Sequence, residues 1–141
     1  MNRADWQRIA EERLLAVQTL LAAQDCWPSA YYLAGYAVEC GLKSCVLARV
    51  ASEPEVIFGD KKFSEKCWTH SIEELVKLAN LDQAREDETA ANSALKSNWL
   101  IVKDWTEKSR YGISSQLQAR ALYEAIADDS AGVMQWIRLR W

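Results

Sequence analysis

The chain has 141 residues, of which 50% are hydrophobic and 26% are charged, and its formal net charge is −3. This length suits one domain with a substantial apolar core, and we expect a single helical domain over residues 1–141. The negative balance argues against nucleic-acid binding through overall positive charge. No uncharged apolar run is long enough to span a membrane. Charges at Arg3, Asp5 and Arg8 argue against a signal peptide, so we expect a cytoplasmic protein.

Cysteine and histidine are too sparse for a metal centre. The four cysteines show no C-x-x-C spacing, and His70 is the only histidine. Two of the cysteines lie in the most apolar stretch of the chain, where Cys behaves as a small hydrophobe. Because metal sites need several ligands close together, we expect neither a metal nor another cofactor.

A first amphipathic helix is predicted over residues 5–24, where apolar residues recur at helical spacing. Arg13 lies within the apolar stripe of this helix. Its aliphatic stem lies along the core with the guanidinium in water, or it faces inward as the partner of a carboxylate such as Glu39. The sequence leaves both interpretations open.

A second helix, apolar on nearly all sides, is predicted over residues 28–49. Pro28 fits the first turn of a helix, and the composition is typical of a helix covered by its neighbours. Gly41 costs about 1 kcal/mol relative to Ala inside a helix, which a close helix crossing would offset. Helical geometry places four polar or aromatic side chains on one face: Tyr32, Tyr36, Glu39 and Lys43.

Residues 51–69 break the helical period and contain Lys61, Lys62 and Lys66. A connection of this length is either functional or mobile. We expect a mobile surface loop, and the alternative is that its lysines receive a phosphate.

Residues 71–74, Ser-Ile-Glu-Glu, match a capping box and predict a short third helix that ends at about Asn80. His70 lies at the start of this helix. Two interpretations of His70 are open. Either the neighbouring backbone holds its side chain, or the side chain lies beside a ligand phosphate that the helix N-terminus attracts.

Two further helices are predicted over residues 83–105 and 115–141, each with one continuous apolar stripe. Gly112 and two serines interrupt the period between them. Together these patterns predict an all-α, antiparallel up-and-down bundle with four long helices and one short helix.

Residues 31–43, Tyr-Tyr-Leu-Ala-Gly-Tyr-Ala-Val-Glu-Cys-Gly-Leu-Lys, resemble the second helix of HEPN domains. These are helical domains associated with nucleotide binding. The resemblance continues at Thr69-His70, at the short helix that follows, and at Ser109-Arg110-Tyr111. It covers most of the chain in the expected order and implies a HEPN-like bundle.

Many HEPN domains are metal-independent ribonucleases whose activity depends on an Arg followed, after a short polar gap, by a His. This chain departs from that motif, because no histidine follows His70. Ser109-Arg110-Tyr111 is instead similar to a branch in which Arg-Tyr replaces that pair and whose members are encoded beside minimal nucleotidyltransferases. The resemblance implies a non-catalytic homodimer that binds a nucleotide, RNA or a nucleotidyltransferase partner, in a toxin–antitoxin or defence setting.

The candidate ligand-binding residues are the charged and aromatic side chains that could converge between helices: Glu39, Lys43, His70, Lys108, Arg110 and Tyr111. Glu39 and Lys43 also suit a structural ion pair. Arg110 either grips a phosphate beside a stacking surface on Tyr111, or it pairs with a carboxylate while Tyr111 packs on the bundle. The alternative function is a ribonuclease in which His70 moves the 2′-hydroxyl proton and Arg110 stabilises charge on the phosphate.

Overall fold

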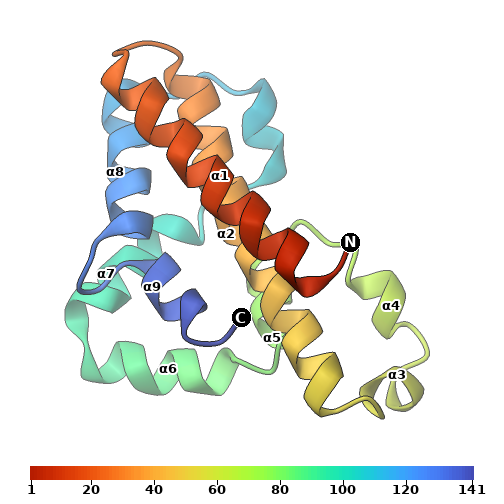
Figure 1. The fold of residues 1–141 in the computed structure, drawn as a ribbon. Coiled ribbons are helices and arrows are strands. Elements are labelled where there is room, and N and C mark those ends of the chain that lie inside the picture. The colour runs from red at the N-terminus through yellow and green to blue at the C-terminus, as the bar shows by residue number, and fades with distance from the viewer.

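The computed structural model describes residues 1–141 and is an all-α helical bundle without strands, as the sequence predicts. Its two longest helices, α1 (Arg3–Ala22) and α2 (Trp27–Ser52), pack along each other in opposite directions (Figure 1). A capping box between Asn2 and Asp5 begins α1. Pro28 lies in the first turn of α2, as expected.

Two glycines let neighbouring side chains approach α2 closely. A Cβ on Gly41 would lie 2.9 Å from Cγ2 of Ile137, which agrees with the close contact expected at that glycine. A Cβ on Gly35 would lie 2.2 Å from Cγ of Trp105, so the Trp105 indole lies directly on the α2 backbone. No pattern in the sequence predicts this second contact.

The stretch expected as one helix over residues 83–105 is divided into α6 (Asp82–Ala91) and α7 (Ser93–Val102). Asn92 causes the break because its backbone is extended and its side chain accepts a hydrogen bond from the Leu95 N–H, which caps α7. The two helices therefore follow different directions, and α6 runs along one end of the bundle in Figure 1.

The last stretch is divided in the same way, into α8 (Gln116–Ala127) and α9 (Val133–Arg138). Asp128 leaves the helical conformation, and its side chain accepts hydrogen bonds from the Ala131 N–H and the Ser130 hydroxyl, which forms a turn. A Cβ on Gly132 would lie 2.4 Å from the Asp128 carbonyl oxygen, so the turn requires glycine there. The sequence predicts four long helices and one short helix, but in the structure two of the long helices are each divided into two shorter ones.

Residues 51–69 contain two single-turn helices, α3 (Val56–Gly59) and α4 (Phe63–Lys66), in place of the expected loop. Phe63 is buried and anchors the segment to the core. The short helix α5 (Ile72–Leu78) follows as predicted, with the Ser71 hydroxyl accepting from the Glu74 N–H. Glu74 does not complete the capping box, because its carboxylate accepts from the Thr69 hydroxyl.

The core lies on both sides of α2, against α1, α5, α8 and α9. The C-terminal segment is docked, which agrees with its continuous apolar stripe: Arg138 donates two hydrogen bonds of 2.7 Å to Glu11, and the Trp141 carbonyl accepts from Arg3. None of the helices combines the length and the apolar character that crossing a bilayer requires.

Candidate functional site

Three of the predicted site residues, Glu39, Lys43 and His70, meet on one face of α2. Glu39 is 1% exposed, and its Oε1 accepts a hydrogen bond of 2.8 Å from Nζ of Lys43. The same oxygen lies 2.9 Å from Nδ1 of His70. The other carboxylate oxygen, Oε2, is buried and has no hydrogen-bond partner. A buried carboxylate is costly unless it is paired, and here a lysine and a histidine share that role.

His70 is oriented by this carboxylate rather than by backbone groups at the start of α5. Because Glu39 accepts, we assign the Nδ1–H tautomer to the imidazole. The second ring nitrogen, Nε2, lies on the opposite edge and has no protein partner, and the side chain is 53% exposed. The imidazole therefore presents one free nitrogen to solvent while the other is fixed by a group in the core.

An aromatic row continues along α2 from this cluster. The rings of Tyr36 and Tyr32 are stacked with centroids 5.9 Å apart, and Trp105 stacks on Tyr32 at 6.1 Å. Arg13 of α1 lies over Tyr36, with its guanidinium carbon 6.0 Å from the ring centroid. Arg13 forms neither a hydrogen bond nor an ion pair with Glu39, whose Oε1 contacts Lys43 and His70 and whose Oε2 has no partner.

Burial makes the titratable groups beside this row harder to ionise. Burial, with Cys40 and Glu39 nearby, raises the pKa of Tyr36 to about 12. Burial also raises the pKa of the Cys40 thiol to about 12. Cys40 is a free, buried thiol, and a protonated, buried thiol is a poor nucleophile. The side chains of this face that can bind or react with a ligand are therefore those of His70, Lys43 and Arg13.

The remaining candidates lie on the 3₁₀ helix η1 (Glu107–Tyr111), which packs on α2 just after Trp105. Lys108 and Arg110 are exposed, and Tyr111 is 81% exposed. The Arg110 guanidinium carbon lies 4.8 Å from the Tyr111 ring centroid. Arg110 forms no ion pair, and Tyr111 is not packed on the bundle, so the structural interpretation of these two residues is wrong.

No hydrogen bond or ion pair joins the η1 residues to Glu39, Lys43 and His70. The two groups are nevertheless neighbours along α2, because Trp105 packs on Gly35 and Gly35 is one helical turn from Glu39. The structure therefore divides the predicted site into a buried-carboxylate cluster and an exposed Arg-Tyr pair.

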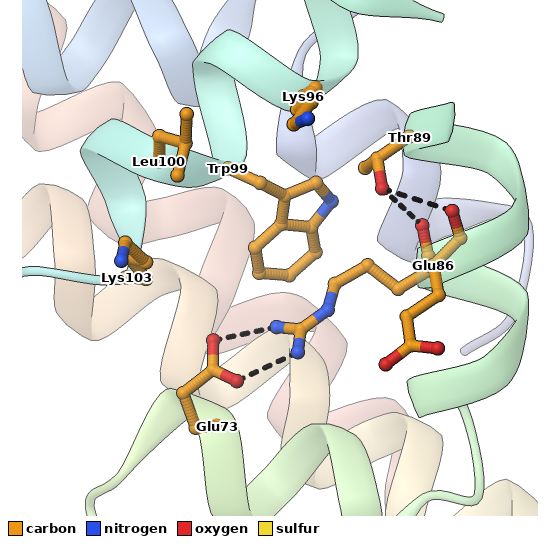
Figure 2. Close-up of a pocket in the computed structure, with 8 residues that line it drawn as sticks. Glu73, Glu86, Thr89, Lys96, Trp99, Leu100 and Lys103 are labelled. Carbon is orange, nitrogen blue, oxygen red and sulfur yellow. Dashed lines mark hydrogen bonds and ion pairs between the residues drawn. The ribbon is translucent and has the colours of Figure 1, made fainter. Parts of the chain in front are cut away.

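A hollow of about 440 Å³ between α5, α6 and α7 contains none of the predicted residues (Figure 2). Arg85 donates two hydrogen bonds of 2.7 Å to Glu73 and lies over the Trp99 ring. This forked contact lowers the pKa of Glu73. Since Arg85 is already satisfied by a carboxylate, we interpret this hollow as a structural junction between helices.

No group of three or more His, Cys, Asp or Glu side chains is placed to hold a metal ion. Comparisons of the chain with protein-family models, with curated proteins and with solved structures found no match.

Proposed function

We propose that this chain is a HEPN-like domain of the Arg-Tyr branch that binds a nucleotide or RNA without cleaving it. The observation that carries the proposal is the exposed Arg110, which lies over Tyr111 and has no carboxylate partner. A guanidinium donates in a forked geometry that matches two phosphate oxygens, and an aromatic ring offers a stacking surface to a base. Lys108, exposed on the same helix, adds positive charge.

The cluster on α2 adds a second set of polar groups to the proposal. Glu39 holds His70 against α2 through a hydrogen bond of 2.9 Å, which fixes the segment between α4 and α5. The free Nε2 of His70, which carries no proton in this tautomer, is available to accept a hydrogen bond from an N–H or O–H group of a ligand. Lys43 offsets the charge of the buried carboxylate, so the cluster does not repel a phosphate.

In this proposal the domain acts in the cytoplasm as a homodimer, with a nucleotidyltransferase as its protein partner in a toxin–antitoxin or defence system. Exposed apolar side chains next to Arg110 support an interaction surface there: Tyr111, Ile113 and Leu117 are 81%, 98% and 78% exposed. Apolar groups gathered on a surface are typical of contact sites for other molecules.

The binding proposal is tested by isothermal titration with ATP and with a short RNA. We expect both to bind the wild type and to lose about tenfold in affinity in Arg110→Gln, because one charge-assisted contact to phosphate is lost. Arg8→Gln is the matched control, since Arg8 is exposed on α1 and pairs with Asp5. Absence of binding to either ligand by the folded wild type contradicts the proposal.

A second candidate, a metal-independent ribonuclease, is favoured by the hydrogen bond between Glu39 and His70. A carboxylate on Nδ1 leaves Nε2 free to take the proton of a 2′-hydroxyl, whose oxygen then attacks phosphorus while the 5′-oxygen leaves. Arg110 would stabilise the charge that develops on the phosphate.

Incubation of the purified protein with structured and single-stranded RNA in EDTA separates the two candidates. Cleavage that disappears in both His70→Ala and Arg110→Ala supports the ribonuclease. Intact RNA, together with measurable RNA binding, supports the non-catalytic domain.

A further inference from the structure

A hollow of about 830 Å³ lies on the face where α8 packs beside α1 and α7 (Figure 1). Two smaller hollows, of about 330 and 300 Å³, adjoin it, because all three are lined by Gln18 of α1 and Tyr123 of α8. We call this continuous surface around Gln18 and Tyr123 the α8 groove. None of the residues proposed above to bind a ligand lines it.

Small side chains line the α8 groove where α7 meets α8. Ala94 and Ser97 come from α7, and Ala121 and Ala125 come from α8. Ile101, which is 41% exposed, continues the α7 side. The α7 residues recur at the spacing of one helix face, and those that line the groove carry no charge. An exposed, uncharged helix face beside a hollow is the form of groove that receives the apolar side of another helix.

The unpaired charges on the α8 groove are carboxylates. Glu124 on α8 and Asp129 in the turn after it are exposed, and neither side chain forms a hydrogen bond or an ion pair. The two arginines that line the groove, Arg120 and Arg138, both donate to acceptors on α1. The groove therefore presents free negative charge without free positive charge.

These carboxylates distinguish between the possible occupants of the groove. A nucleic acid carries phosphates, which the carboxylates repel. A second copy related by a two-fold axis would set the same surface against itself, so Glu124 and Asp129 would meet a surface without a free cation. A helix with lysine or arginine beside an apolar stripe matches both the hollow and its charge.

We infer that the α8 groove docks an amphipathic, basic helix of a protein partner. Leucine or isoleucine side chains of that helix fill the hollow between α7 and α8, and its lysines or arginines face Glu124 and Asp129. The 12 residues of α8 span about 18 Å, which suits about three turns of a partner helix. The inference goes beyond the proposed function, because it assigns a second surface that is separate from Arg110.

The test is fluorescence polarisation of three labelled synthetic peptides of about 12 residues, each added to the full chain. One peptide carries leucine on one helix face and lysine elsewhere. The second keeps the leucines and replaces each lysine with glutamate, and the third has the composition of the first in an order without a leucine face. We expect the wild type to bind the first peptide at least about tenfold more tightly than either of the others.

Variants of the groove assign the binding to it. Ser97→Trp fills the hollow from an exposed position and is expected to weaken binding of the lysine peptide about tenfold. Glu124→Lys is expected to weaken binding of the lysine peptide and strengthen binding of the glutamate peptide, each by about fivefold. Glu86→Lys is the matched control, since Glu86 is exposed on α6 outside the groove and makes no ion pair. It changes each affinity by less than about twofold. Circular dichroism checks the fold of each variant.

The inference is overturned if the folded wild type does not bind the lysine peptide, or binds it no better than Ser97→Trp does. The same peptide preference in Glu124→Lys and Glu86→Lys also overturns it. Sedimentation velocity of the protein alone tests the second copy: a dimer that Ser97→Trp dissociates assigns the groove to self-association instead. Titration with ATP and RNA keeps the proposed function separate, because Ser97→Trp is expected to bind both as the wild type does. Loss of RNA binding in Ser97→Trp would assign the groove to nucleic acid and overturn the inference.

Discussion

Glu39 and His70 are 31 residues apart in the chain, yet a hydrogen bond of 2.9 Å joins a carboxylate that is 1% exposed to an imidazole that is 53% exposed. This contact links the centre of α2 to the surface segment before α5. Lys43 donates to the same oxygen, and the two contacts together explain how a carboxylate can be buried in an otherwise apolar core.

Replacing Glu39 with Ala is expected to destabilise the fold by about 3 kcal/mol, because the lysine and the histidine lose the charge that they face. Chemical denaturation with urea measures the change in free energy of unfolding. Glu86→Ala is the control, since that carboxylate is exposed and makes no ion pair. Equal stability of the two variants would show that the buried carboxylate contributes nothing net.

Raising the pH above about 9 is expected to destabilise the fold through its buried thiols. Burial raises the pKa of both Cys40 and Cys45 from 9.0 to about 12. Between these values the unfolded chain releases protons that the folded chain retains, so stability falls as pH rises, by at most about 1.4 kcal/mol per pH unit for each thiol. Below pH 9 this stability is fully present.

The measurement for the thiols is urea unfolding at pH 8 and pH 10.5 in a reducing buffer. Cys40→Ala is expected to flatten the decline between the two values, whereas Cys26→Ala, at an exposed position, leaves it unchanged. An identical decline in Cys40→Ala and the wild type would exclude Cys40 as a source of the pH dependence.

Gly35→Ala is expected to destabilise the fold by about 1–3 kcal/mol, although alanine favours helix, because the new Cβ overlaps the Trp105 indole. Gly59→Ala is the matched control, since a Cβ there meets nothing within 4 Å. Urea unfolding of both variants tests the contact. A Gly35→Ala protein as stable as the wild type would mean that the indole has room to move.

Asn92→Ala is expected to cost about 1 kcal/mol, because α7 loses the side chain that accepts from the Leu95 N–H. Ser93→Ala tests whether the neighbouring position matters, as the Ser93 hydroxyl makes no hydrogen bond. If the two variants unfold at the same urea concentration as the wild type, the cap does not hold the junction between α6 and α7.

Patterns within one segment of the chain predict its elements well. Pro28 marks the start of α2, Ser71 marks α5, and the polar face with Glu39 and Lys43 is present. The break at Asn92 escapes prediction because the apolar stripe continues across it and a single capping residue is a weak local signal. Apolar periodicity shows which residues face the core, but not where a helix changes direction.

Contacts between distant segments are harder to predict from the sequence than the helices themselves. Glu39 and His70 are both candidates from the sequence, but nothing in their surroundings predicts that they bond to each other. The close approach at Gly35 is not predictable because only the position of Trp105, which depends on the whole bundle, explains why a side chain is excluded. Likewise, the partners of most arginines come from other elements, so an arginine without a partner, such as Arg110, can be recognised only in the folded chain.

The hydrogen bond between Glu39 and His70 couples a buried carboxylate in the core to a side chain that ligands can reach at the surface. A molecule that binds the outer nitrogen of the imidazole only in the folded chain raises the melting temperature by mass action. Heating the protein in the presence of a compound library would therefore reveal ligands that bind the folded chain, and those that bind at His70 should lose the signal in His70→Ala.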